Sequence, residues 1–414
     1  MEMLLAPTGQ PAAGAVEEVS ELGYLQNFLH WSGTLRHPNA GPWSSRVHCL
    51  VHVFTIVAML LFICSEVVLL WRDGATDLDE LTLTLCVLNT TITFIFRLRH
   101  IAAWESEFQR LAPQERRDFG EFLSTDDIQL LRVRSRSMRR VVFTYLLSGV
   151  ISSIVYVATP INADGLPLRL ALPYDSSRPL AFAATWLYSA YIVFCIVIVT
   201  MAADSFNISL MVQLRDQLDL LNRNLRCLND RTSRMKSSSL QTLSTTDVEH
   251  TDDLIHDVHY RLRKSIIHHQ AIIRNVALLE QCLGRMLLGQ SLSLGTSFCL
   301  QLFQAAKRAK GVQEVGKAGS YLMLVFSVLF MYCWFGDDLI SESEKVALSA
   351  YDAVPSLEEC PTSTKRSLLI LMHRAQQPLR VTAGGFFSLS RESLVSVLNV
   401  SYSFFTILRN FKDD

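Results

Sequence analysis

Long apolar stretches alternate with polar ones along the whole chain. A helix needs roughly 20 apolar residues to cross a hydrocarbon core about 30 Å thick. Seven stretches approach or reach this length, at approximately 47–71, 78–96, 138–158, 180–202, 286–306, 318–335 and 386–408. The pattern predicts an all-α membrane protein with seven transmembrane helices.

The second stretch is the most polar of the seven. It carries Thr82, Thr84, Asn89, Thr90, Thr91 and Thr93. Inside a helical bundle such groups can form hydrogen bonds to neighbouring helices or line a cavity. We therefore expect these residues to mark a face that points into the bundle.

Basic residues indicate which ends of the helices face the cytoplasm. With the N-terminus inside, the inner segments hold 27 lysines and arginines and the outer segments hold 9. Cytoplasmic loops carry the excess of basic residues in membrane proteins. The distribution predicts a cytoplasmic N-terminus and an external C-terminus, which is opposite to G-protein-coupled receptors.

The polar segment between the fourth and fifth stretches contains helical periodicity. Five leucines recur at spacings of four and three, at Leu214, Leu218, Leu221, Leu225 and Leu228. Apolar residues repeat in the same way from Ile255 to Val276. This pattern predicts that two helices continue below the membrane and pack on each other. The segment 232–247 lacks periodicity and predicts a loop between them.

Composition agrees with a membrane protein. Half of the residues are hydrophobic, 19% are charged and the mean hydropathy is +0.24, whereas soluble chains carry about 25% charge. No basic stripe with interleaved aromatic residues is present, so we expect no nucleic-acid partner.

Catalytic and metal-binding patterns are missing from the sequence. No CxxC motif occurs, and we expect the four histidines of one polar helical segment, His256, His259, His268 and His269, to be solvated. The acidic residues Asp204 and Glu280 stand alone in the sequence, without a nucleophile or base beside them. We predict neither an enzyme nor a metal site, and no cofactor.

Two stretches carry a family resemblance. The segment YCWFGDDLISESEKVALSAY, 332–351, resembles the end of the sixth span and the following cytoplasmic helix of insect odorant receptors. The segment TAGGFFSLSRESLVSVLNVSYSFFTILRNF, 382–411, resembles their seventh span. Related gustatory receptors carry Thr-Tyr and a terminal Gln-Phe where this chain has Ser401-Tyr402 and Asn410-Phe411. The resemblance therefore favours an odour-tuned receptor.

The resemblance implies a ligand-gated cation channel of four subunits around a central pore. The chain lacks the long cytoplasmic insertion typical of the shared co-receptor, so it resembles the odour-tuned subunit of a heterotetramer with that co-receptor. The implied location is the plasma membrane of olfactory sensory neurons, and the implied ligand is a small volatile odorant.

The predicted spans and this family define six regions. They are a cytoplasmic N-terminal segment (1–46), four spans with an outer ligand region (47–203), cytoplasmic helical extensions that form an anchor (204–285), two further spans (286–335), anchor helices (336–385) and the pore-lining seventh helix (386–411). The apolar run Leu368 to Met372 in the second anchor region predicts a buried interface.

The family also implies a gate in the seventh helix. Ser403, Ile407 and Phe411 are separated by four residues and share one helix face. By resemblance, Ile407 and Phe411 lie at the hydrophobic gate and Asn410 beside it. Ordinary helix packing is the alternative explanation of this stripe.

The ligand pocket of the family lies between the second, third, fourth and sixth helices, in the outer half of the membrane. Candidates at that depth are Thr84, Leu88, Ser148, Ser152, Tyr156, Trp186, Tyr188, Tyr321 and Val325. Each aromatic residue could instead anchor the helix at the membrane interface or pack in the core.

Three other functions fit parts of the pattern. A gustatory-receptor-like channel would share the topology. A metabotropic seven-helix chemoreceptor would have the opposite orientation and an Asp-Arg-Tyr-like motif after the third span, and this motif is missing from the sequence. A transporter would show internal repeats, and the sequence contains no convincing repeat.

Overall fold

A computed structural model shows a helical protein with one short hairpin. It describes residues 22–73, 78–120, 122, 125–159, 165–171, 174, 178–239, 247–308 and 312–413. The elements are α2 (Leu22–Trp31), α3 (Pro42–Asp73), α4 (Leu78–Ala103), α5 (Glu105–Gly120), α6 (Thr125–Ala158), α7 (Pro179–Phe194), η1 (Cys195–Val199), α8 (Thr200–Ser239), α9 (Asp247–Arg308), α10 (Val312–Asp352), η2 (Val354–Leu357), α11 (Thr362–Ala375), β1 (Thr382–Ala383), β2 (Phe387–Ser388) and α12 (Arg391–Asp413).

Six helical stretches are long and apolar enough to cross a membrane, counted over the described residues. They begin at Pro42, Leu81, Asp126, Pro179, Ile255 and Ala318. These six coincide with the first six predicted spans. Helix α12, which contains most of the seventh predicted span, is not among them.

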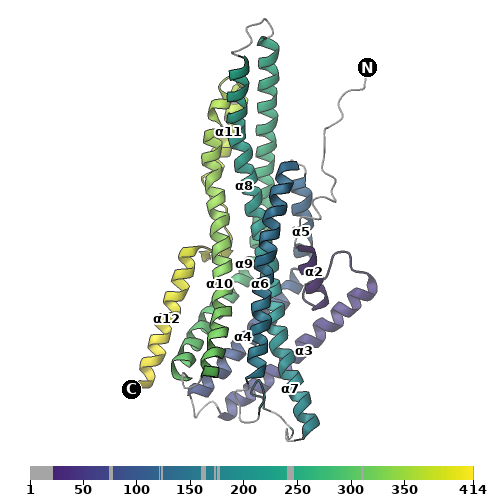
Figure 1. Cartoon of the computed structure of the whole chain (residues 1–414), viewed down its shortest axis with the longest axis vertical. Helices are drawn as coiled ribbons and strands as arrows, with labels where there is room; N and C mark the ends of the chain where they lie inside the picture. Colours follow the sequence, from purple (N-terminus) through teal and green to yellow (C-terminus); the bar gives the residue numbers. More distant parts are fainter. Residues whose placement is uncertain are drawn as a thin grey trace.

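Several helices extend far beyond the membrane thickness. Helix α9 has 62 residues, which at 1.5 Å per residue makes it about 93 Å long. Helices α8, α9, α10 and α11 form a tall stalk at one end of the molecule, and α3, α4, α7 and α12 lie towards the other (Figure 1).

The leucine stripe predicted between the fourth and fifth spans lies in the core of this stalk. Leu214, Leu218, Leu221, Leu225 and Leu228 of α8 are all buried, together with Val258, Leu262 and Val276 of α9. The predicted loop 232–247 is wrong in its first part, because α8 continues to Ser239. Residues 240–246 of that prediction lie outside the described residues.

The predicted interface at Leu368 to Met372 has two faces in α11. Leu368 and Leu371 are buried, whereas Leu369 and Ile370 are exposed in the single chain. One side of this helix therefore packs inside the subunit, and the other leaves apolar side chains uncovered.

The helix that contains most of the seventh predicted span begins later than predicted. The sequence placed its start at Phe386, but α12 begins at Arg391. Strands β1 and β2 pair antiparallel before it, with Thr382 opposite Ser388. Gly384 and Gly385 have φ angles of 62° and 81°, which glycine adopts without steric strain. A tight turn therefore separates the predicted anchor region from α12.

Candidate functional site

A pocket lies between three membrane helices and the loop that follows α6. Its walls come from Glu66 of α3, from Leu83, Thr84 and Val87 of α4, from Tyr156 of α6 and from Pro167, Leu168 and Arg169 of the loop. Its cavity volume is about 20 Å³, which leaves room for about one water molecule, and part of it is open to the outside. The mostly apolar lining with a few polar groups resembles that of small-molecule sites, and a ligand larger than water would enter only if the walls move apart.

Two of the nine predicted ligand residues, Thr84 and Tyr156, line this pocket. Thr84 is buried and Tyr156 is half-buried. Leu88, one turn from Thr84 on α4, is half-buried but does not line it.

The two candidates on α7 lie in the same core cluster as the pocket wall. Trp186 and Tyr188 pack in a cluster that also contains Tyr156 and Leu168. The Tyr188 hydroxyl donates a hydrogen bond to the Ala58 carbonyl oxygen at 2.7 Å. Tyr188 therefore ties α7 to α3.

The remaining four candidates lie elsewhere in the structure. Ser148 is exposed and its hydroxyl donates to the Tyr145 carbonyl oxygen, whereas Ser152 is buried. On α10, Val325 is buried and the Tyr321 hydroxyl shares a 2.9 Å hydrogen bond with the Thr90 hydroxyl of α4. None of these four lines the pocket described above.

Sequence reasoning missed six of the eight lining residues. Four are apolar and carry no local signal. Glu66 did carry one, because it is the single acidic residue within the first apolar stretch. An ionisable side chain inside a membrane helix is a functional candidate by default.

The polar face of α4 points into the bundle, as predicted. The Asn89 amide donates to the backbone oxygen and hydroxyl of Ser293 and to the hydroxyl of Ser297 on α9, at 2.9–3.1 Å. Thr93 donates to Ser293 as well. These side chains join α4 to α9.

Asp204 is not isolated, which corrects the sequence-based expectation. Its carboxylate accepts two hydrogen bonds from the Arg97 guanidinium, at 3.2 and 2.5 Å. Gln290 and the Tyr332 hydroxyl also donate to it, at 3.2 and 2.8 Å. Both charged residues are buried, and the contacts of the Asp204 carboxylate join α4, α8, α9 and α10.

Glu280 also has a partner, because it accepts a hydrogen bond from the Thr382 hydroxyl at the hairpin. The same hydroxyl accepts one from the Gly385 backbone N–H at 3.0 Å. This carboxylate therefore helps to position the turn that leads into α12.

Ionic contacts hold the start of α12 against α10. The Arg391 guanidinium pairs with Asp337 at 3.3 Å and donates to Asp338 at 2.8 Å, both on α10. It also lies 4.0 Å from the centre of the Trp334 ring, within cation–π distance. α10 therefore fixes the base of the predicted pore helix.

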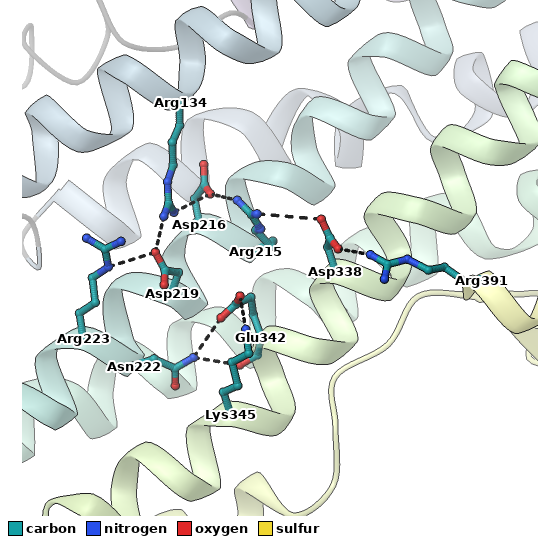
Figure 2. A network of polar contacts seen from close by, with 10 residues as sticks. All are labelled: Arg134, Arg215, Asp216, Asp219, Asn222, Arg223, Asp338, Glu342, Lys345 and Arg391. Atoms are coloured by element: carbon teal, nitrogen blue, oxygen red, sulfur yellow. Dashed lines mark hydrogen bonds and ion pairs between the residues drawn. The ribbon is translucent and has the colours of Figure 1, made fainter.

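This contact belongs to a longer chain of alternating charges (Figure 2). Arg215 of α8 lies 3.9 Å from Asp338 and 2.7 Å from Asp216. Arg134 of α6 bridges Asp216 at 3.0 Å and Asp219 at 2.6 Å. The network therefore connects the four helices α6, α8, α10 and α12 through successive ion pairs.

The predicted gate lies further along α12. Ser403 and Ile407 are exposed in the single chain. Asn410 and Phe411 fall within α12, but their side chains lie outside the described ones. Val395, Val400, Tyr402 and Phe404 are exposed on the same helix, so a large part of its apolar surface is free to contact lipid or another subunit.

The expectation of four solvated histidines is wrong for two of them. His256 and His259 are exposed, whereas His268 and His269 are buried. The His268 ring stacks on Phe122 at 4.7 Å and forms a 3.0 Å hydrogen bond with Gln217. They belong to the helix core. The described residues hold no group of three or more potential metal ligands.

Known proteins match this chain along most of its length. The family model "7tm Odorant receptor" matches residues 74–402. Odorant receptor 10 of Aedes albopictus is 24% identical over 367 residues, covering 87% of this chain and 91% of the relative. Odorant receptor Or2 of Anopheles gambiae is 23% identical over 400 residues, covering 95% and 98%.

A solved structure has the same fold. The insect olfactory receptor OR5 from Machilis hrabei, in complex with eugenol, aligns with a TM-score of 0.75 and 13% identity, covering 96% of this chain and 99% of that one. With a family model that spans most of its residues, the chain belongs to the odorant receptor family of insects.

Proposed function

We propose that this chain is the odour-tuned subunit of a ligand-gated cation channel that forms a heterotetramer with the odorant receptor co-receptor. Its N-terminus is cytoplasmic, it spans the plasma membrane of olfactory sensory neurons seven times, and α12 lines the pore. The observation that carries the ligand-binding part is the pocket walled by α3, α4, α6 and the loop after α6.

The lining of the pocket fits a small volatile ligand. Leu83, Val87, Pro167 and Leu168 provide apolar surface, and Thr84 and Tyr156 provide hydroxyl groups. Apolar burial supplies affinity, and a few polar groups fix the orientation of the ligand. The other predicted contacts, Leu88, Ser148, Ser152, Trp186, Tyr188, Tyr321 and Val325, remain candidates for a larger site in another state of the receptor.

The coupling route we infer runs through the buried ion pair and the charge network. The pocket helix α4 contributes Arg97 to the buried ion pair, and the pocket helix α6 contributes Arg134 to the charge network. Arg391 then connects α10 to α12. An odorant that binds the open state more tightly shifts the equilibrium towards it, and α12 moves Ile407 and Phe411 away from the pore axis.

The exposed apolar side chains of α12 support the assembly. In a single chain Ile407 is 49% exposed and Phe404 57%. Polar and apolar groups on one helix suit a pore wall that closes by dewetting.

Whole-cell recording with a panel of volatiles, with and without the co-receptor, tests the proposal. We expect a fast cation current that needs the co-receptor and survives a block of G-protein signalling. A response that disappears under that block would favour a metabotropic chemoreceptor. Activation by tastants alone would favour a gustatory-receptor-like channel.

A further inference from the structure

The pocket contains an acidic side chain at membrane depth. Glu66 is 3% exposed and lines the pocket. It lies six residues before Arg72, the end of the apolar stretch that begins at Pro42, so it is about 9 Å along the helix from that end. Its neighbour Val67 is 50% exposed on the outward side of α3.

A carboxyl group in such a place is costly without a partner. Burying it away from water carries a large penalty unless it is paired or neutral. The charged group that interacts with it across the pocket is Arg169. Arg169 belongs to the outer loop and is partly exposed, so water can solvate its guanidinium when another cation takes its place.

We propose that the pocket selects small apolar amines and that Glu66 is the group that recognises their nitrogen. This inference rests on the proposed role of the pocket as the odorant site. Leu83, Val87 and Leu168 would hold the hydrocarbon part, because they form the apolar wall beside Glu66.

An amine forms the same ammonium–carboxylate pair with Glu66 whether this side chain is protonated or ionised before the amine binds. A neutral amine takes the proton of the carboxylic acid on its nitrogen lone pair, which leaves an ammonium beside a carboxylate. A protonated amine pairs directly with the carboxylate. Charge-assisted hydrogen bonds of this kind are among the strongest in proteins. An ester or ketone can only accept a neutral hydrogen bond from the protonated carboxyl group, which is weaker than the charge-assisted pair, and an acid adds a second negative charge beside the carboxylate.

Potencies on the unmodified receptor, expressed with its co-receptor, test the proposal without any mutation. Each skeleton in the panel is offered as amine, alcohol, carboxylic acid and hydrocarbon, for example cyclohexylamine, cyclohexanol, cyclohexanecarboxylic acid and methylcyclohexane. We expect the amine to act at a concentration on the order of ten-fold or more below the alcohol. Alcohols at equal or better potency would overturn the proposal. Acids as the best agonists would overturn it in favour of Arg169.

Variants then assign the effect to Glu66. Glu66→Gln keeps the shape and removes the charge, so amines should lose about ten-fold or more in potency while alcohols change little. Val67→Ala, on the outward side of the same helix, should leave the ranking unchanged. Arg169→Gln should maintain or improve amine potency. An unchanged amine potency in Glu66→Gln, at matched surface level, would contradict the proposal.

Failure of the inference differs from failure of the proposed function. Tyr156→Ala alters the pocket whatever the ligand class, so it should reorder the panel. A reordered panel with no preference for amines overturns only the role of Glu66. If the ranking of the panel does not change, or if the receptor responds to no volatile, this pocket is not the odorant site and the proposed function is contradicted. If Glu66→Gln does not reach the surface, the potencies on the unmodified receptor decide.

Discussion

At the scale of single residues, the buried pair Arg97–Asp204 is expected to contribute strongly to the stability of the bundle. Both side chains are buried, and Gln290 and Tyr332 complete the shell of Asp204. Removing one partner of a buried ion pair costs about 3–5 kcal/mol, because the other charge remains unpaired. We therefore expect Asp204→Asn to reduce surface expression and thermal stability strongly.

A fluorescence-based thermal assay in detergent and surface labelling measure this effect. The matched control is Asp257→Asn, which breaks a half-exposed pair with Arg261 on one helix and should change little. Normal stability of Asp204→Asn would show that the pair does not hold the bundle together.

Single residues also show where sequence reasoning stops. Thr84 and Tyr156 could be placed in the pocket because depth and helix identity follow from the spans. Arg169 could not be placed there, because nothing in the sequence shows that its loop folds back on the bundle. His268 was assigned to solvent because nothing local to α9 indicates that Phe122 covers it.

At the scale of elements, the base of α12 is the junction between the hairpin and the predicted pore helix. The apolar pattern predicted six spans well, since a membrane imposes a minimum length on each. It placed the start of the seventh at Phe386, because Phe386 and Phe387 are apolar although they lie in the hairpin and not in the helix. The contact of Arg391 with Asp338 could not be predicted, because the two residues lie far apart in the sequence and no local pattern links them.

The Arg391–Asp338 contact predicts energetic coupling. Arg391→Gln and Asp338→Asn should each raise the half-maximal odorant concentration about two- to five-fold, as expected for a partly exposed pair. The double variant should shift it by less than the two effects combined, because the residues share one contact. Lys345→Gln, which breaks a pair within α10 only, serves as the control. Fully additive shifts would show that the pair does not couple α10 to α12.

If the proposed gate lies in α12, its polar variants should show a leak current. Replacing Ile407 or Phe411 with serine should raise odour-independent current, because water can then occupy an apolar constriction. Phe404→Ser is the matched control, since this residue is turned about 60° from Ile407 and should reduce expression or response instead. Equal basal currents in Phe411→Ser and the unmodified receptor would remove Phe411 from the gate.

At the scale of the whole molecule, the positions of the stalk and of α12 bear on the predicted topology. The C-terminal end of α12 lies at the end of the molecule opposite the stalk (Figure 1), and basic residues favour a cytoplasmic stalk. On intact cells, a tag after Asp414 should be labelled and a tag before Met1 should not. Labelling of the N-terminal tag alone would show that the orientation in the membrane is opposite to the predicted one.

The central claim is that the whole receptor opens a channel when an odorant binds the outer pocket. One measurement tests it most directly: whole-cell current evoked by a volatile panel, compared between the unmodified chain and Tyr156→Ala, each with the co-receptor. The account predicts co-receptor-dependent cation currents whose odour ranking changes in Tyr156→Ala while maximal current is largely kept. An identical ranking at matched surface level, or no current with any volatile, would contradict it.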